Sequence, residues 1–236
     1  MLGSTYLRHD ICDNTFMTAK DLISGAVLPL KTSDTGLIAM HWFDEFKVSH
    51  LPVVGDSQLL GLISEDDIFA AGSFEEPIWN NQLQLQNISI LQSRHIYEAM
   101  KLFADYKLTT LPVIDEKGIY LGLITLADMV EKMALTAAVS NPGGIVVLEL
   151  NANDFSMVEI AKIVEDNDAK ILSFYVSSPS DSTRLELTLK LNRIDIQPVM
   201  QSFLRYDYTI KASFFESDYF DNLRERYDLL MTYLNV

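Results

Sequence analysis

One stretch of about 60 residues occurs twice in this chain, and the second copy follows the first directly. A shift of 60 positions superimposes Leu51-Pro52-Val53 on Leu111-Pro112-Val113. After one extra residue in the second copy, Leu60-Gly61-Leu62-Ile63 aligns with Leu121-Gly122-Leu123-Ile124 at a shift of 61. A polar hairpin loop tolerates such an insertion, so these runs are predicted to be hairpin strands. A doubled unit of this size favours two small units over one large domain.

Each copy has its own pattern of local structure. Apolar residues at helical spacing predict amphipathic helices over residues 34–46 and 94–106. The hairpin strands that follow are LPVV with LLGLI in the first copy and LPVI with YLGLI in the second. The segments EDDIFAAG and LADMVEKMA then predict helices. Each copy is therefore expected to run helix, strand, strand, helix, with a short strand in front.

Charge and composition exclude several classes of partner. The formal net charge is −15 at pH 7, and no cluster of Lys and Arg offsets it, which argues against nucleic acid and anionic membrane as main partners. No apolar run approaches the length of about 18 residues that a membrane span needs, and the start MLGSTYLRHDICDNTF is polar where a signal peptide needs an apolar core. Cys12 is the only cysteine, so no internal disulfide is expected. We expect a cytoplasmic protein.

The doubled pattern resembles a pair of CBS domains, the regulatory module named after cystathionine β-synthase. The resemblance rests on Leu51-Pro52-Val53 followed by the run from Gly61 to Asp67, and on Leu111-Pro112-Val113 followed by the run from Gly122 to Asp128. It covers roughly residues 17 to 138. It implies that the copies pack about a pseudo-twofold axis and leave two clefts, in which adenosine derivatives such as AMP, ADP, ATP or S-adenosylmethionine bind.

Two hydroxyl-carboxylate pairs are the principal candidate site residues. Ser64 with Asp67, and Thr125 with Asp128, have the spacing of a capping box, in which both side chains satisfy backbone donors at a helix start. The family resemblance implies a second role, in which the Asp accepts hydrogen bonds from ribose hydroxyls and the Ser or Thr meets a phosphate beside the helix N-terminus. Capping and binding can coexist at these positions.

The resemblance also implies a wall and a phosphate contact for each cleft. Leu28 and Leu30 align with Ile88 and Ile90, in the segment that holds adenine in the family, although core packing explains the same residues. His50 stands at a position that is often basic in the family, whereas its equivalent is Thr110, so the two clefts should differ. Further basic candidates for phosphate contact are Lys31, Lys47, Arg94, His95 and Lys107. A weak phosphate grip would favour adenosine or S-adenosylmethionine as the ligand.

Beyond residue 138 the pattern changes to alternating strands and helices. The order is β-α-β-β-α-β, and within it Leu185, Leu187, Leu189 and Leu191 alternate strictly with polar residues. Following a CBS pair, this order resembles the ACT domain, a small-ligand and dimerisation module, over residues 143 to 215. The turn after its first strand reads NANDF without the glycines of the ACT amino-acid site, so that binding motif does not carry over.

The predicted architecture is of the α+β or α/β class: a CBS-pair module of two helix-strand-strand-helix repeats, plus a ferredoxin-like βαββαβ, ACT-like domain. The predicted divisions are an N-terminal segment at 1–16, CBS domains at 17–76 and 77–138, a linker at 139–143, an ACT-like domain at 144–216 and a C-terminal helix at 217–236. Such a helix, with apolar residues at helical intervals, would lie on a neighbour or a second subunit. We expect a homodimer.

No catalytic motif is apparent. The chain has no HExxH, P-loop or GxSxG sequence, and its four histidines show no metal-ligand spacing. The acidic run from Glu65 to Asp67 is explained by the helix macrodipole without a metal. We therefore expect no enzyme, no catalytic cofactor and no metal site. The expected function is a regulatory protein that senses an adenosine-containing ligand and signals to an unidentified effector protein; the alternative is a scaffold with ligand-free clefts.

Overall fold

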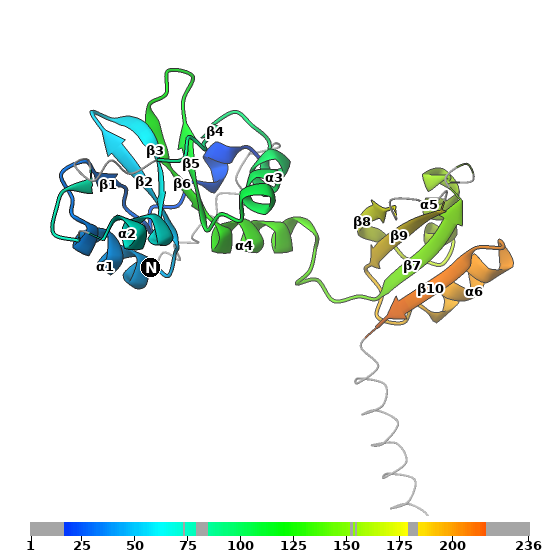
Figure 1. Cartoon of the computed structure of the whole chain (residues 1–236). Coiled ribbons are helices and arrows are strands. Elements are labelled where there is room, and N and C mark those ends of the chain that lie inside the picture. Colours follow the sequence, from blue (N-terminus) through cyan, green and yellow to red (C-terminus); the bar gives the residue numbers. More distant parts are fainter. Residues whose placement is uncertain are drawn as a thin grey trace, which may run out of the picture. The chain divides into compact units, whose positions relative to one another are not determined.

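The computed structural model describes residues 17–72, 74–78, 85–151, 153, 155–178 and 184–215 (Figure 1). The chain divides into two compact units, Met1–Lys132 and Met133–Val236; the described residues form two three-stranded sheets in the first unit and one four-stranded sheet in the second. The predicted N-terminal segment at 1–16 and the predicted C-terminal helix at 217–236 lie outside the described residues. No helix in the described part of the chain is long and apolar enough to cross a membrane.

The first copy of the repeat forms a three-stranded sheet with two helices. Strand β1 (Leu30–Lys31) pairs in parallel with β2 (His50–Gly55), and β2 pairs antiparallel with β3 (Gln58–Ser64) as the predicted hairpin. Helix α1 (Gly36–Phe46) precedes the hairpin and α2 (Glu65–Ala71) follows it. The helix predicted over 34–46 is therefore confirmed.

The second copy repeats this arrangement. Strand β4 (Ile90–Leu91) pairs in parallel with β5 (Thr110–Ile114), which pairs antiparallel with β6 (Tyr120–Thr125). Helices α3 (Ile96–Tyr106) and α4 (Leu126–Thr136) flank the hairpin, so the helix predicted over 94–106 is also confirmed. In both copies the helix before the hairpin ends at a lysine in the left-handed conformation.

The segment that leads into each copy crosses to the sheet of the other copy. The Ser24 amide, just after the short 3-10 helix η1 (Ala19–Leu22), donates to the carbonyl of Leu123 at 2.8 Å. In the reverse direction, Gln86 exchanges two backbone hydrogen bonds with Leu62, each of 2.9 Å. In the first unit, therefore, the leading segment of each copy hydrogen-bonds to the sheet of the other copy. Neither copy forms all of these backbone hydrogen bonds by itself.

The crossing explains the glycine in each Leu-Gly-Leu-Ile run. Gly61 and Gly122 have the same φ of 152°, which side chains rarely adopt. A Cβ on Gly61 would lie 2.7 Å from Cβ of Leu85, and one on Gly122 would collide with the side chain of Ile23. Both contacts are made by the crossing segments. The glycine is thus repeated because a second backbone passes over it in each half.

Helices and sheet in the first copy enclose an apolar core to which the second copy contributes. Trp42 and Phe74 pack against its edge. The fully or nearly fully buried members are Val27, Leu30, Ala39, Phe43, Val48, Leu51, Val53, Ile63, Ile68, Ile78 and Leu123. Leu123 comes from β6, so the crossing is reinforced by shared burial of apolar surface.

The second unit is a four-stranded antiparallel sheet with two helices. The strand order β10-β7-β9-β8 is that of a ferredoxin-like split βαβ repeat, as predicted. Its elements in chain order are β7 (Ile145–Asn151), α5 (Met157–Glu165), β8 (Ile171–Ser177), β9 (Arg184–Leu191), α6 (Gln197–Arg205) and β10 (Thr209–Phe214). Leu187, Leu189 and Leu191 are fully buried, which confirms the predicted alternation in β9.

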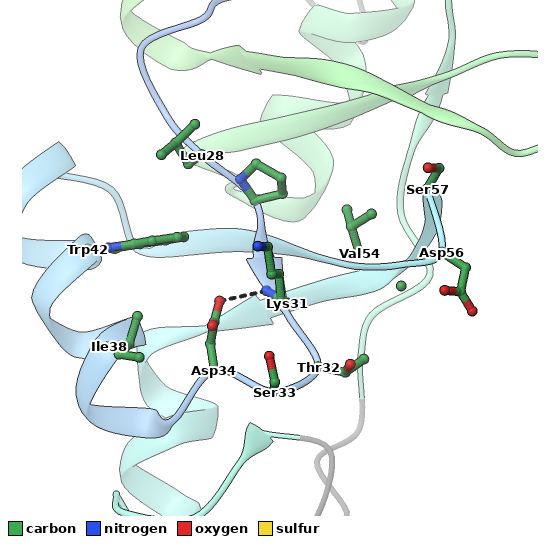
Figure 2. A pocket seen from close by; sticks show the side chains of 12 residues that line it. Leu28, Lys31, Thr32, Ser33, Asp34, Ile38, Trp42, Val54, Asp56 and Ser57 are labelled. Carbon is green, nitrogen blue, oxygen red and sulfur yellow. Dashed lines mark hydrogen bonds between the residues drawn. The ribbon is translucent and has the colours of Figure 1, made fainter.

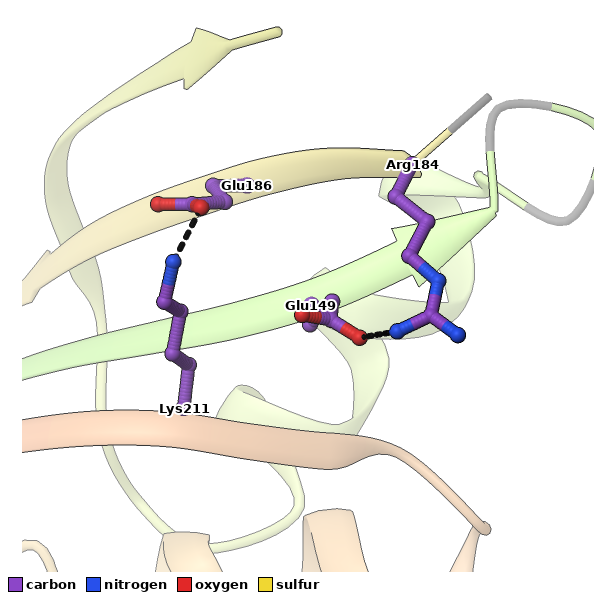
Figure 3. Close-up of polar contacts among 4 residues, drawn as sticks. All are labelled: Glu149, Arg184, Glu186 and Lys211. Atoms are coloured by element: carbon purple, nitrogen blue, oxygen red, sulfur yellow. Dashed lines mark hydrogen bonds and ion pairs between the residues drawn. The ribbon is translucent and has the colours of Figure 1, made fainter. Parts of the chain in front are cut away.

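The face of this sheet that lies opposite its core carries two ion pairs (Figure 3). Glu149 on β7 stands directly opposite Glu186 on β9, and like charges in that position repel each other. Arg184 pairs with Glu149, and Lys211 of β10 pairs with Glu186. Each carboxylate therefore has a compensating base, which makes the opposed pair tolerable in the sheet.

Candidate functional site

A cleft of about 860 Å³ in the first unit contains one of the two predicted hydroxyl-carboxylate pairs. The second copy supplies the end of β6 and the first turns of α4, and the first copy supplies its crossing segment and the end of α1. The lining residues are Ser24, Ala26, Val27, Phe46, Lys47, Val48, Thr109, Thr125, Leu126, Ala127, Asp128, Val130 and Glu131. We call it the Asp128 cleft. Residues of both copies line it.

Thr125 and Asp128 form a capping box at the start of α4. The Thr125 hydroxyl donates to Oδ2 of Asp128, and the Asp128 amide donates to Thr125 Oγ1 at 3.0 Å. The Thr125 amide makes a longer contact of 3.4 Å to the same carboxylate oxygen. Among the described residues no hydrogen bond reaches Oδ1 of Asp128, so the cap leaves half of the carboxylate available to another donor.

Ser64 and Asp67 repeat this geometry at the start of α2. The Ser64 amide donates to Oδ2 of Asp67 at 2.9 Å, and the Asp67 amide donates to Ser64 Oγ at 3.2 Å. Glu65 and Asp66 stand in the same helical turn, so three carboxylates crowd this helix start. The local electrostatics are therefore less favourable to an anionic ligand than at Asp128.

His50 lies where the two copies meet rather than among the residues of the Asp128 cleft. Its Nδ1 accepts a hydrogen bond from the Thr109 amide at 3.3 Å, and its carbonyl accepts from the Thr110 hydroxyl at 2.8 Å. Burial lowers the pKa of His50, and the nearby Asp67 and Asp66 partly oppose that shift. A neutral imidazole that accepts at Nδ1 serves as a connector between the copies, and it gives a phosphate no positive charge at neutral pH.

The predicted apolar wall is divided between different places. Leu30 and Ile90 are buried in the cores, and Ile88 is half-buried. Leu28 is 56% exposed and lines a second cavity (Figure 2) instead of the Asp128 cleft. The cleft uses residues 26–27 just before it, because the crossing segment meets the sheet of the second copy there. An alignment of one copy with the other cannot reveal that exchange.

The basic candidates are also dispersed. Lys47 is the one basic residue among the described residues that line the Asp128 cleft, where its Nζ lies 2.6 Å from Oδ1 of Asp44. Lys31 lines the second cavity and Arg94 pairs with Glu98 at 3.4 Å. The remaining two act at the ends of α3, with His95 as N-cap and Lys107 as C-cap. Lys47 belongs to the first copy, and the fold brings it to the Asp128 cleft, whose hydroxyl-carboxylate pair comes from the second copy.

Metal ligation has no support in the described residues, among which no group of three or more His, Cys, Asp or Glu side chains could hold an ion. The three acidic residues at the start of α2 are among the described residues and do not form such a group. Its first-turn carboxylates face the positive end of the helix dipole, which stabilises them without a cation.

Comparison with known proteins identifies the doubled unit. Residues 37–73 and 86–135 match the CBS domain family, which confirms the predicted CBS domain pair. The chain is similar to inosine-5'-monophosphate dehydrogenase of Aquifex aeolicus, with 28% identity over 91 residues, 37% of this chain and 19% of the enzyme. It has the same identity to the Korarchaeum cryptofilum enzyme over 113 residues, 47% of this chain and 23% of that one. The chain thus spans less than a quarter of either relative.

Solved structures with a similar fold include CBS-pair proteins. A CBS domain pair/ACT domain protein from Thermotoga maritima aligns with a TM-score of 0.46 and 19% identity, over 50% of this chain and 98% of that one. CBSX2 from Arabidopsis thaliana, in complex with AMP, aligns with a TM-score of 0.44 and 22% identity, over 50% of this chain and 97% of that one.

Proposed function

We propose that this protein is a regulatory module that senses an adenosine-containing ligand in its CBS-pair clefts and relays the signal to a partner protein. The observation that carries the proposal is the carboxylate of Asp128, which lines a cleft of about 860 Å³ and uses only Oδ2 for its cap. That volume suits a ligand of nucleotide size. The family match at residues 86–135 supports the same position.

The chemistry of the cleft fits the parts of an adenosine. The uncommitted Oδ1 of Asp128 can accept charge-assisted hydrogen bonds from the ribose hydroxyls. The first amides of α4, an 11-residue helix, favour negative charge beside Thr125. Val27 from the first copy and Val130 from the second copy supply apolar surface for the base. The base, the sugar and a phosphate would thus each meet a suitable group.

Charge limits the number of phosphates that this cleft should accept. Lys47 is the single base in the described lining, and Asp128 and Glu131 contribute two negative charges. A triphosphate would meet a net negative surface, in a protein of net charge −15. We therefore expect adenosine, S-adenosylmethionine or AMP to bind more tightly than ATP.

A thermal-shift and calorimetry screen with adenosine, AMP, ADP, ATP and S-adenosylmethionine tests the proposal. A ligand that binds only the folded state must raise the melting temperature in a concentration-dependent way. Asp128→Asn should keep the shape of the cap but lose the charge-assisted bonds to ribose, and so bind more weakly at a nearly unchanged melting temperature of the free protein. Unchanged affinity in this variant would reduce Asp128 to a cap.

The alternative is a scaffold whose clefts have no ligand. The observation that favours it is that both carboxylates already complete capping boxes, so the fold needs them without any nucleotide. A screen in which no adenosine compound shifts melting at millimolar concentration would favour the scaffold. In that case the geometry that the two helix starts share would be a feature of folding alone.

We further propose that residues 144–216 form an ACT-like domain, separated from CBS domains at 17–76 and 77–138 by a linker at 139–143. The strand order β10-β7-β9-β8 supports this. The domain would serve association into a homodimer and not amino-acid binding, because the glycines of the ACT turn are absent from NANDF. Light scattering should give a dimer mass at micromolar protein, and a monomer would contradict the proposal.

A further inference from the structure

The second cavity lies wholly within the first copy and has a volume of about 760 Å³ (Figure 2). None of the four residues of the capping boxes lines it. Its walls are the loop between β1 and α1, one side of α1 and the turn of the β2–β3 hairpin. The lining residues are Leu28, Pro29, Lys31, Thr32, Ser33, Asp34, Ile38, Trp42, Val54, Gly55, Asp56 and Ser57. We call it the Trp42 cavity.

The Trp42 cavity has an apolar side that water reaches. Trp42 is only partly buried at the edge of the core, and Figure 2 shows its indole between Leu28 and Ile38. Leu28 is 56% exposed and Ile38 is 38% exposed. Apolar side chains gathered around an accessible indole are typical of a binding site and uncommon on an unused surface.

The charged side of the cavity is net negative. Asp34 and Asp56 contribute two carboxylates, against the single ammonium of Lys31. One oxygen of Asp34 is held by the Lys31 amide at 2.8 Å, which fixes the carboxylate at the cavity edge. Asp56 is exposed on the tight hairpin turn, with φ of 49°. The side chain of Lys31 is also exposed, and its long flexible stem lets the ammonium move toward solvent.

The second copy has no tryptophan and one charged residue at the positions of the apolar side. At the shift of 60 positions Leu102 stands in place of Trp42, and Glu98 stands in place of Ile38. Arg94, the equivalent of Asp34, pairs with Glu98 at 3.4 Å. At these positions the second copy has an exposed ion pair, where the first copy has a partly exposed indole.

A further polar contact joins the loop and the hairpin turn in the second copy. Gln92 Nε2 donates to Oε2 of Glu116 at 3.3 Å. The equivalent residues of the first copy are Thr32 and Asp56, whose side chains are shorter, and both line the cavity. The hairpin turn of the second copy is also one residue longer, so the region of the Trp42 cavity differs between the copies in side chains and in turn length.

We propose that the Trp42 cavity binds an organic cation, specifically an amine that carries an apolar or aromatic group. The ammonium is attracted by the face of an indole and by the carboxylates of Asp34 and Asp56. The apolar group covers Leu28 and Ile38. The overall charge of −15 raises the local concentration of cations and opposes an anionic ligand. This site is independent of the adenosine clefts and does not rest on the function proposed for them.

Three compounds with the same ring but different charge test the class of ligand. We would titrate the full chain with phenethylamine, 2-phenylethanol and 3-phenylpropionate, and follow indole fluorescence in a Trp79→Phe background, where Trp42 is the only tryptophan. Phenethylamine should give a saturable change and bind about tenfold more tightly than the alcohol, because charge-assisted contacts to carboxylates and cation–π attraction are added. The propionate should bind most weakly. Equal binding of amine and alcohol, or no saturable change with the amine, would overturn the proposal.

Substitutions of two exposed residues, Asp56 and Lys31, should change the affinity for phenethylamine in opposite directions. Asp56→Asn should weaken phenethylamine binding about threefold to tenfold, whereas Lys31→Gln should strengthen it, because only the first removes a negative charge. Asn adopts the left-handed conformation of Asp56 readily, so folding should be preserved. Glu116→Gln, at the equivalent position of the second copy, is the matched control and should change nothing. The reverse order of signs, or an equal effect of Glu116→Gln, would refute the site.

Discussion

The two copies of the repeat agree at the positions that shape the backbone and the helix starts, and differ at side chains around the Trp42 cavity and at the contact between the copies. Both have a glycine that the crossing segment of the other copy contacts, and a hydroxyl-carboxylate capping box. Both also have a lysine in the left-handed backbone conformation at the end of the first helix. They differ at Trp42, which aligns with Leu102, and at His50, which aligns with Thr110. The shared residues meet requirements of the fold that both copies have, and the divergent ones give each copy a different surface.

The largest expected effect concerns the shared glycines. Gly61→Ala and Gly122→Ala should each cost about 2 to 5 kcal/mol of unfolding free energy, from backbone strain and overpacking together. Gly61→Ala should cost more, because its Cβ meets Cβ of Leu85 and the carbonyl of Gln86 at 3.0 Å, whereas Ile23 beside Gly122 can turn its side chain. Urea unfolding measures both. Gly25→Ala is the control, since no atom lies within 4 Å of its Cβ; equal loss there would contradict the explanation.

The next effect compares the two caps as ligand sites. Asp128→Asn should cost about 1 to 3 kcal/mol of binding free energy for an adenosine ligand. Asp67→Asn should cost less, because Glu65 and Asp66 already make its surroundings unfavourable for a phosphate. Isothermal titration of both variants with AMP ranks them. A greater loss at Asp67 would show that the first copy supplies the principal cleft.

The third effect is a dependence on pH that comes from His50, whose equivalent in the second copy is Thr110. The lowered pKa of His50 means that the unfolded chain takes up this proton at higher pH than the folded chain. The contribution of His50 to stability is therefore complete above the ordinary pKa of about 6.5 and is lost as the pH falls from there toward the lowered folded pKa. Urea midpoints measured across this window should fall less steeply for His50→Gln than for the wild type. Parallel curves would assign the titration to other groups.

The smallest effect concerns the exposed ion pair between Arg94 and Glu98 in the second copy. Glu98→Ala should lower the unfolding free energy by only about 0.3 to 0.5 kcal/mol, because Arg94 and Glu98 are exposed and screened by water. Chemical denaturation detects it best as a difference between low and high salt. A loss several times larger would mean that the pair organises the loop between β4 and α3. The double variant Arg94→Ala with Glu98→Ala separates the pair from its single members.

Much of this fold could be predicted from the repeat itself. Helical spacing before each hairpin and strict alternation in β9 determine local structure, and burial of Leu187 and Leu189 follows from that alternation. The crossing could not be predicted, because two similar copies offer similar sheets and the periodicity does not say which sheet a leading segment joins. The part of the leading segment that lines the Asp128 cleft depended on that choice, so the cleft contains residues 26–27 and Leu28 lies in the Trp42 cavity.

The candidate site was predicted in part for the same reason. Thr125 and Asp128 were identified because cap and family pattern coincide at one short motif, and both line a cleft. The Trp42 cavity was missed, although a signal existed. Comparing the copies position by position for differences, rather than for matches, would have selected Trp42 and Ile38, whose equivalents Leu102 and Glu98 have another size or charge.

Because the leading segments are exchanged, a molecule with a single copy of the repeat would lack contacts that the other copy supplies. A chain that carried only the second copy would have β6 without the Ser24 strand partner and a helix start at Thr125 without the opposing residues 46–48. Two such chains could restore the missing contacts by trading segments, as domain-swapped proteins do. Duplication followed by fusion would then have turned an encounter between molecules into a permanent one. In the fused chain each half therefore completes the other whatever the protein concentration.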